Sequence, residues 1–183
     1  NLGSMIDLTA AASALEAANQ VVAAGIARLA EIGLDENQVL AYDVAHAAAA
    51  VQTGQSLLGY GIKGDVEASI ANAFIADAIA ELAGKVFGRE SEWGVGFDAF
   101  DSTREYVATY RNPEFLAGLA GTAGPRHLSD DFEMVQDAFR RFADEKLKPV
   151  AEHIHRHNGD IPEDIITGLA EMGAFGLSIA EEY

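Results

Sequence analysis

Three long alanine-rich segments, residues 7–31, 35–58 and 65–86, constrain the fold more than any other feature of this sequence. Within each segment the larger apolar residues recur every three or four positions, which is the spacing of one face of an α-helix. Alanine also has the highest helix propensity of the common residues. Gly33 and Gly88 follow the first and third segments, where a glycine commonly ends a helix. The pattern predicts three long helices packed against one another.

Polar residues in front of the apolar segments indicate where helices begin. We expect Asp35 and Asp65 to cap the second and third long helices, and Ser102 to cap a short helix around residues 104–111. Ser129 precedes a further helix that carries three acidic residues in its first turn, where they interact favourably with the helix dipole. These signals predict at least five helices along the chain.

Three prolines set the other expected boundaries. Pro113 and Pro162 are each expected at the first position of a helix, because proline has no N–H to leave unpaired there. The second of these helices should end at Gly173, and residues 174–183, which lack a helical period, are expected to be extended. Pro149 should kink or break the helix that precedes it. Because no strand pairing is indicated anywhere, the sequence predicts an all-α fold.

The glycines Gly59, Gly61 and Gly64 have the spacing G-x-G-x-x-G of a dinucleotide-binding fingerprint. That fingerprint requires a β-strand before the first glycine and a helix after the last. Here a helical segment precedes Gly59, so we interpret the glycines as an inter-helix turn in which they supply positive φ angles. No binding of NAD or FAD is expected at this motif.

The less regular region after the third long helix separates two parts of the chain. Trp93, Phe97 and Phe100 are expected to anchor its loops. The stretch AGTAGPRH is small, glycine-rich and proline-containing, which is typical of a linker. The expected organisation has four parts: a cloning scar and start at 1–5, an alanine-rich helical bundle at 6–119, a linker at 120–127 and a second helical part at 128–183.

Composition disfavours several classes of function. The net charge is −17, and acidic residues outnumber basic ones in both parts, so nucleic acid and anionic membrane surfaces are disfavoured as partners. The chain has no cysteine and therefore no disulfide, thiolate metal site or cysteine nucleophile, which fits a reducing compartment. No apolar run is long enough to span a bilayer and no signal peptide is visible, so a cytoplasmic location is expected.

Histidines are the most conspicuous candidates for chemistry. Glu152 and His155 form the E-x-x-H pair of di-iron helical bundles, and His153 and His157 lie four positions apart in the same segment. A di-iron site needs a second E-x-x-H motif, which this sequence lacks, so we interpret the segment as a polar helix end. His46 lies among alanines, and we expect it to be hydrogen-bonded in the core or at an interface.

Several spaced motifs fill residues 128–183: Leu128-Ser129, Met134, the run RRFADEKLKP, Ile161-Pro162 and LAEMGAFGLSIAEEY. Together they resemble the amino-terminal helical segment of the flavin-dependent acyl-CoA dehydrogenases. In that family the last motif normally ends close to P-E-E-Y-G-G. Here Ala180 stands in place of the proline, and the sequence stops at Tyr183 before the two glycines.

The resemblance implies FAD-dependent α,β-dehydrogenation of an acyl-CoA thioester. A carboxylate would remove the α proton, the β hydride would pass to the flavin, and the electrons would leave through an electron-transfer flavoprotein. In the family the flavin contacts come from the middle β-domain and the last helical bundle, and the catalytic glutamate lies in the carboxy-terminal part. Residues 1–183 match none of those segments, so we expect no catalytic, cofactor-binding or metal-binding residue in this chain.

Residues 6–119 resemble a degenerate copy of the family's own carboxy-terminal bundle, through LAYDVAHAAAAVQTGQSLL and EASIANAFIADAIAELAGKVFG. Members of the family with such an extension include those similar to the (2S)-methylsuccinyl-CoA dehydrogenase type. The resulting hypothesis is an amino-terminal fragment of a longer acyl-CoA dehydrogenase. An alternative of another class stays open: a free-standing helical module for assembly or partner binding, without catalysis.

Apolar residues at helical spacing after Ser129 predict self-association. Phe132, Val135, Phe139 and Phe142 share one helix face. In the resembled family the apolar side chains of these helices pack against other domains, and here they are Phe132, Phe139, Phe142, Ile165, Ile166 and Leu169. Left uncovered, such a face exposes more apolar surface than soluble monomers usually tolerate. We expect a homo-oligomer, or packing of the second part on the first, and in either case burial of Phe139 and Phe142.

Overall fold

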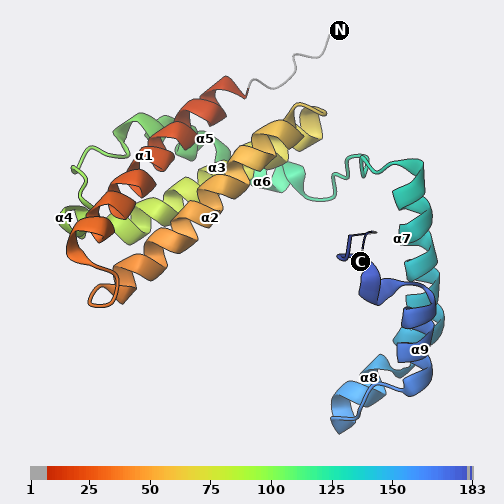
Figure 1. Cartoon of the computed structure of the whole chain (residues 1–183). Helices are drawn as coiled ribbons and strands as arrows, with labels where there is room; N and C mark the ends of the chain where they lie inside the picture. Colours follow the sequence, from red (N-terminus) through yellow and green to blue (C-terminus); the bar gives the residue numbers. More distant parts are fainter. Residues whose placement is uncertain (1–7, 181, 183) are drawn as a thin grey trace, which may run out of the picture. The chain divides into compact units, whose positions relative to one another are not determined.

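A computed structural model describes residues 8–180 and residue 182 (Figure 1). The chain divides into two compact units, Asn1–Pro125 and Arg126–Tyr183, which we call the first and the second unit. Within the described residues every regular element is helical, which confirms the predicted all-α fold. The expected scar and start at residues 1–5 lie outside the described residues.

The three long predicted helices are present as α1 (Thr9–Ile32), α2 (Gln38–Gly61) and α3 (Asp65–Val86), which pack together in the first unit. Glycines let these helices approach closely. A Cβ added at Gly54 of α2 would lie 2.8 Å from Cδ1 of Leu15, which is too short for a normal contact. The shared core includes the buried side chains of Leu15, Val22, Leu40, Val44, Ile75, Ile79, Leu82 and Val86.

The starts of α2 and α3 differ from the predicted capping residues. Asn37, not Asp35, immediately precedes α2, and its Nδ2 donates hydrogen bonds to the carbonyl oxygens of Ile32 and Gly33 at 3.2 and 2.9 Å. The amide thereby closes the turn that follows α1, which a carboxylate could not do because it has no N–H. Asp65 is the first residue of α3 itself and not its cap. Gly33 has a positive φ of 84°, as its predicted place after α1 requires.

Four shorter helical elements complete the first unit: α4 (Glu90–Trp93), η1 (Asp101–Thr103), α5 (Arg104–Tyr110) and α6 (Pro113–Leu119). Trp93 is fully buried and packs on α1 at Gly25, as expected of an anchor. Phe100 is half-buried, whereas Phe97 is 88% exposed, so the prediction that Phe97 is an anchor was wrong. Its ring lines an open pocket on the surface instead of entering the core.

The boundaries of α5 and α6 test two further predictions. Thr103, not Ser102, precedes α5; it is buried, and its Oγ1 donates to the carbonyl oxygen of Phe100 at 2.8 Å. Helix α6 begins at Pro113, as predicted. The side-chain oxygen of Asn112 accepts a hydrogen bond from the backbone N–H of Glu114 at 2.8 Å, which caps this short helix.

The second unit contains α7 (Asp130–Phe142), the π-helical segment η2 (Ala143–Leu147), α8 (Lys148–His157), α9 (Glu163–Glu171) and the 3₁₀ turn η3 (Ala174–Gly176). Ser129 precedes α7 as predicted, although its side chain makes no capping hydrogen bond. Pro149 is the second residue of α8, and α8 follows η2 directly. The widened turn accommodates a residue that cannot donate to the helix and whose ring crowds the preceding turn.

Two predictions for the end of the second unit need correction. Pro162 precedes α9 instead of occupying its first position, so the helix begins one residue later than expected. The stretch after Gly173 is not extended, because η3 and a following turn occupy it up to residue 178. A glycine with φ of 74° at position 173 lets the chain leave α9 and enter this tighter turn.

The second unit buries little of its apolar surface. Among its described residues Ile165 alone is buried, at 2% exposure. Phe139 and Phe142 are half-buried, and the ring of Phe142 lies over Gly168, where an added Cβ would be 2.6 Å from its Cε2. The exposed large apolar side chains in this unit are Leu128, Phe132, Met134, Val135, Ile161, Ile166, Phe175, Leu177 and Ile179.

Candidate functional site

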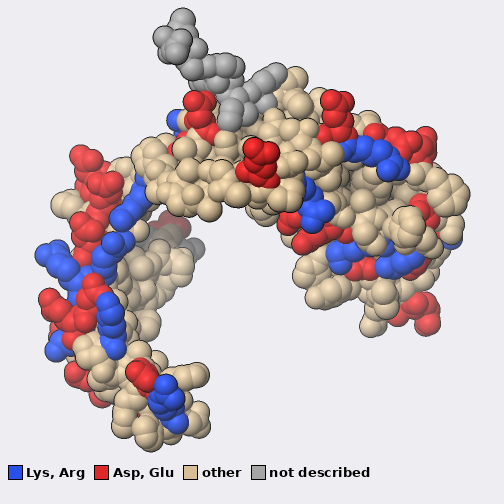
Figure 2. Space-filling model, turned by 180° about the vertical axis from the view of Figure 1, so that it is seen from behind, with Lys and Arg blue, Asp and Glu red and all other residues tan. Residues whose placement is uncertain are grey.

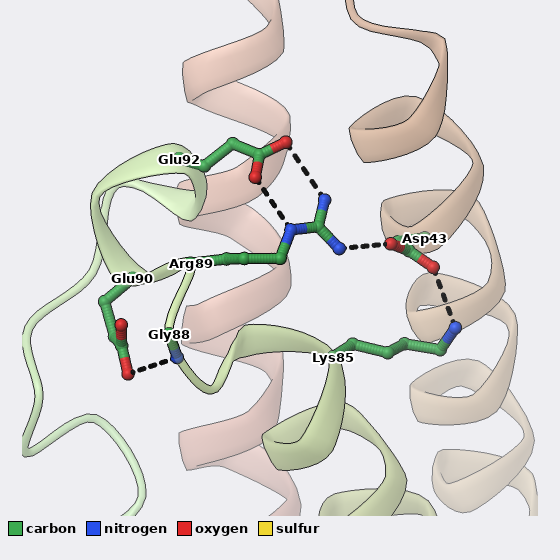
Figure 3. A network of polar contacts seen from close by, with 6 residues as sticks. All are labelled: Asp43, Lys85, Gly88, Arg89, Glu90 and Glu92. Atoms are coloured by element: carbon green, nitrogen blue, oxygen red, sulfur yellow. Dashed lines mark hydrogen bonds and ion pairs between the residues drawn. The ribbon is translucent and has the colours of Figure 1, made fainter.

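A polar cluster of the first unit joins α2, α3 and α4 and consists of Asp43, Lys85, Arg89 and Glu92 (Figure 3). We call it the polar clamp. Nζ of Lys85 lies 2.8 Å from Oδ1 of Asp43, and Nη1 of Arg89 lies 2.7 Å from Oδ2 of the same carboxylate. Arg89 also donates to both oxygens of Glu92, at 2.7 and 3.0 Å. One carboxylate of α2 thus receives cations from the end of α3 and the start of α4.

The polar clamp holds its acids in the ionised form. The hydrogen bond from Lys85 lowers the pKa of the Asp43 carboxyl, against the opposing effect of burial, and Arg89 adds to the lowering. The hydrogen bond from Arg89 likewise lowers the pKa of Glu92, while Glu92 and Asp43 raise the pKa of Arg89. Carboxylates held this way do not exchange protons near neutral pH. The arrangement suits the joining of helices and not acid–base catalysis.

A pocket of about 490 Å³ lies between α3, α5 and the loop before η1. Its volume is in the range of small-molecule sites, and its walls are mostly apolar, with Phe87 and Phe97 among them. The polar side chains at its edge already have partners: Glu90 accepts from the N–H of Gly88, and Arg104 pairs with Asp101 at 2.8 Å. The pocket therefore offers apolar surface without a converging set of reactive groups.

The prediction that the glycine triplet forms an inter-helix turn was wrong for Gly59 and Gly61, and only Gly64 lies between α2 and α3. Helix α2 continues through Gly59 to Gly61, and Gly64 is extended with φ of 172°, so none of the three glycines has the left-handed conformation. Gly61 is required by packing instead, because an added Cβ would lie 2.8 Å from Cδ1 of Leu8. A helix in place of the strand means that the segment does not fit the pyrophosphate of FAD or NAD.

The histidine-containing segment forms the exposed helix α8. Glu152 pairs with Arg156 at 2.7 Å, and the rings of His153 and His157 lie on one side of the helix with centroids 4.2 Å apart. Among the described residues no group of three or more His, Asp or Glu side chains is placed to hold a metal ion. His46 is exposed on α2, so of the two expected positions the core was wrong, and the position at an interface stays a prediction.

His46 is exposed because it lies on the outer face of α2, where the centroid of its ring is 4.2 Å from that of Tyr42.

Basic and acidic side chains are mixed on the surface. On the face seen in Figure 2, basic residues lie among acidic ones instead of gathering in one basic patch. That face therefore offers no footprint for a polyanion. Within the described part of the chain, none of the helices has the length and apolar character needed to cross a bilayer.

Comparison with known proteins identifies the second unit. Residues 129–183 match the model of the acyl-CoA dehydrogenase N-terminal domain. This stretch is an acyl-CoA dehydrogenase amino-terminal region. Its helices α7, α8 and α9 correspond to the matched residues, so the resemblance drawn from the motifs of residues 128–183 is confirmed.

The chain is also similar to the curated (2S)-methylsuccinyl-CoA dehydrogenase of Cereibacter sphaeroides, with 31% identity over 136 residues. The aligned part covers 66% of this chain and 25% of that protein, so the chain spans about a quarter of the relative's length. Since 66% of 183 residues is about 121, and residues 129–183 are only 55, the similarity includes part of the sequence before the acyl-CoA dehydrogenase region. No solved structure matches the chain.

Sequence reasoning missed the polar clamp. Lys85, Arg89 and Glu92 lie four and three positions apart, a spacing that indicates neighbours on one side of a helix. Their common partner Asp43 is 42 and 46 residues away from the two cations, so no local pattern connects it to them. Only the packing of α2 on α3 places the carboxylate within reach.

Proposed function

We propose that residues 1–183 form the amino-terminal part of an FAD-dependent acyl-CoA dehydrogenase, and that the complete protein acts on methylsuccinyl-CoA or a closely related thioester. One observation carries the proposal: similarity to the methylsuccinyl-CoA dehydrogenase extends beyond the region common to the family. A relative that shared only the common region would align over residues 129–183 alone.

In this proposal the chain has an alanine-rich bundle extension at 6–119, a linker at 120–127 and the family's amino-terminal segment at 128–183. The complete protein would remove the α proton with a carboxylate and pass the β hydride to FAD, with an electron-transfer flavoprotein as acceptor. We derive no step of this chemistry from the described residues, because the glycine triplet does not fit a dinucleotide and the carboxylates of the polar clamp are held by cations. The role assigned to this chain is a scaffold, within a homo-oligomer.

Expression of the complete reading frame that contains residues 1–183 tests the proposal. We expect a yellow protein whose flavin absorbance bleaches when methylsuccinyl-CoA is added anaerobically, and bleaches more slowly with a straight-chain acyl-CoA. A colourless product that retains no FAD and reduces no electron acceptor with any acyl-CoA would overturn it. A stop codon directly after Tyr183 would favour the second candidate function.

That second candidate, a helical module for assembly or partner binding without catalysis, is favoured by a groove on the first unit. The groove has a volume of about 560 Å³, lies between α1 and α2, and includes the exposed Ile26 and Leu34. An apolar groove between helices is a common docking site for another amphipathic helix. If the module associates through this groove, the double substitution I26D/L34D should lower its mass in sedimentation; an unchanged mass would remove this support.

A further inference from the structure

Two exposed histidines of α8 are arranged as a pair. His153 and His157 are four residues apart, so their side chains leave the helix on the same side. Their ring centroids are 4.2 Å apart and the ring planes are inclined by 30°. Neither ring is buried by the second unit, so a solute can reach both.

The hydrogen bond of His157 fixes which of its ring nitrogens is available. Nδ1 of His157 lies 2.8 Å from the carbonyl oxygen of His153. A carbonyl oxygen only accepts hydrogen bonds, so Nδ1 must carry the proton that it donates. In the neutral ring the lone pair is then on Nε2, which is the ligand nitrogen. A backbone carbonyl that holds the other ring N–H is the usual outer partner of a metal-bound histidine.

We propose that His153 and His157 form a two-histidine site for a divalent transition-metal ion, with water completing the coordination shell. Imidazole nitrogen suits copper, nickel and zinc, and for a given site Cu²⁺ is expected to bind more tightly than Ni²⁺ or Zn²⁺. Among the described residues no third His, Asp or Glu completes the group. The nearby carboxylate of Glu152 is paired with Arg156. The site is therefore a surface chelate and does not depend on the proposed dehydrogenase function.

Calorimetric titration of the tag-free chain with Cu²⁺ tests the site. We expect binding of one ion, and a loss of affinity of at least about tenfold in H153A and in H157A, because changing even an outer partner of a metal ligand has an effect of that size. The matched control is H155A, which removes a histidine from another side of the same helix. Mg²⁺, which prefers oxygen ligands, should not bind at the pair.

Two results would overturn the site: H155A weakens Cu²⁺ binding as much as H153A does, or the double variant H153A/H157A binds like the parent. A measurement on the unmodified chain guards against variants that fail to fold. Sub-stoichiometric Cu²⁺ should broaden the ring proton resonances of His153 and His157 before those of His46, His127 and His155. Uniform broadening of all five rings would contradict the proposal.

Discussion

The two units of the chain differ in how they stabilise their helices. In the first unit, helices of 24, 24 and 22 residues enclose a shared core. In the second unit, α7, η2 and α8 follow one another without a break, α9 has 9 residues, and Ile165 alone is buried among the described residues there. An isolated helix as short as α9 is marginal in water, so packing has to hold it. The comparison indicates that the helices of the first unit are held by packing within that unit. The helices of the second unit depend on the burial of apolar side chains that its described residues leave exposed.

The largest effect is expected in the core of the first unit. Trp93→Ala removes a fully buried ring and leaves a cavity beside α1. We expect a loss of about 3–5 kcal/mol of unfolding free energy, measured by urea denaturation followed by circular dichroism. The control Phe97→Ala removes an exposed ring and should stay within about 0.5 kcal/mol of the parent. Equal losses in the two variants would mean that Trp93 is not enclosed.

A smaller effect is expected in the second unit. Replacing Phe139 and Phe142 together by serine removes two half-buried rings, one of which packs on Gly168. We expect a loss of roughly 2–3 kcal/mol, or dissociation of a self-associated form, because each ring forfeits part of a full burial contribution. The readouts are the melting temperature and the mass in sedimentation.

The matched control for that pair is Phe132→Ser, which removes an exposed ring from the same helix α7. It should leave the melting temperature unchanged in a monomer and lower it in an oligomer that covers this face. If the double variant keeps both the parental melting temperature and the parental mass, Phe139 and Phe142 face water and the expectation of a covered face is wrong.

The polar clamp should contribute less than the apolar core. Asp43→Asn removes the charge that Lys85 and Arg89 share, and we expect it to cost about 1–2 kcal/mol at pH 7. Because the pKa of Asp43 is lowered in the folded state, its contribution is fully present above the ordinary carboxyl pKa of about 3.9 and is lost as the pH falls through the folded value. The difference between parent and variant should therefore shrink below about pH 4.

An exposed ion pair provides the control for the clamp. Asp77 lies 2.9 Å from Arg111 with both side chains about half exposed. Asp77→Asn should change stability by at most about 1 kcal/mol, because solvent screens such pairs. A loss at Asp77 as large as that at Asp43 would show that burial does not distinguish the clamp.

The smallest effects are expected from two glycines of α2. Gly59 is exposed with no atom within 4 Å of an added Cβ, so Gly59→Ala should stabilise the chain by about 0.5–1 kcal/mol through a less flexible unfolded state. Gly54→Ala should destabilise it by about 1 kcal/mol, because its Cβ would crowd Leu15. The opposite signs can be read from melting temperatures. Stabilisation at both positions would mean that the close approach of α1 and α2 is not required.

The sequence predicted the helical fold and the three long helices. The spacing of apolar residues and the placement of glycines are local signals, and the packing of the folded chain agrees with them here. The sequence-based predictions failed where the geometry of a turn or the packing of the helices decides the local structure. Asp35 and Asn37 both suit the start of α2, and only the geometry of the turn after α1 selects the amide. Phe97 is as apolar as Trp93, but Trp93 packs on α1 at Gly25 whereas Phe97 is exposed.

For candidate sites the sequence revealed motifs but gave no information about contacts between residues that are far apart in the chain. The helix before Gly59 correctly argued against a dinucleotide fingerprint, although the close contact of Gly61 with Leu8 could not be foreseen. His153 and His157 were visible as a spacing, whereas the hydrogen bond that selects the nitrogen Nε2 required coordinates. Asp43 joins its partners only through the packing of α2 on α3.

The π-helical segment η2 also changes the phase of the helix that it interrupts. A π turn holds one residue more than an α turn, and each residue of an α-helix advances the side chains by about 100°. Every face of α8 is therefore rotated by about that angle from where an uninterrupted continuation of α7 would place it. Deleting one residue within Ala143–Leu147 would bring the two helices back into phase, whereas a deletion elsewhere in α7 or α8 would turn one of them out of register. Related chains that differ in length by one residue are expected to differ here.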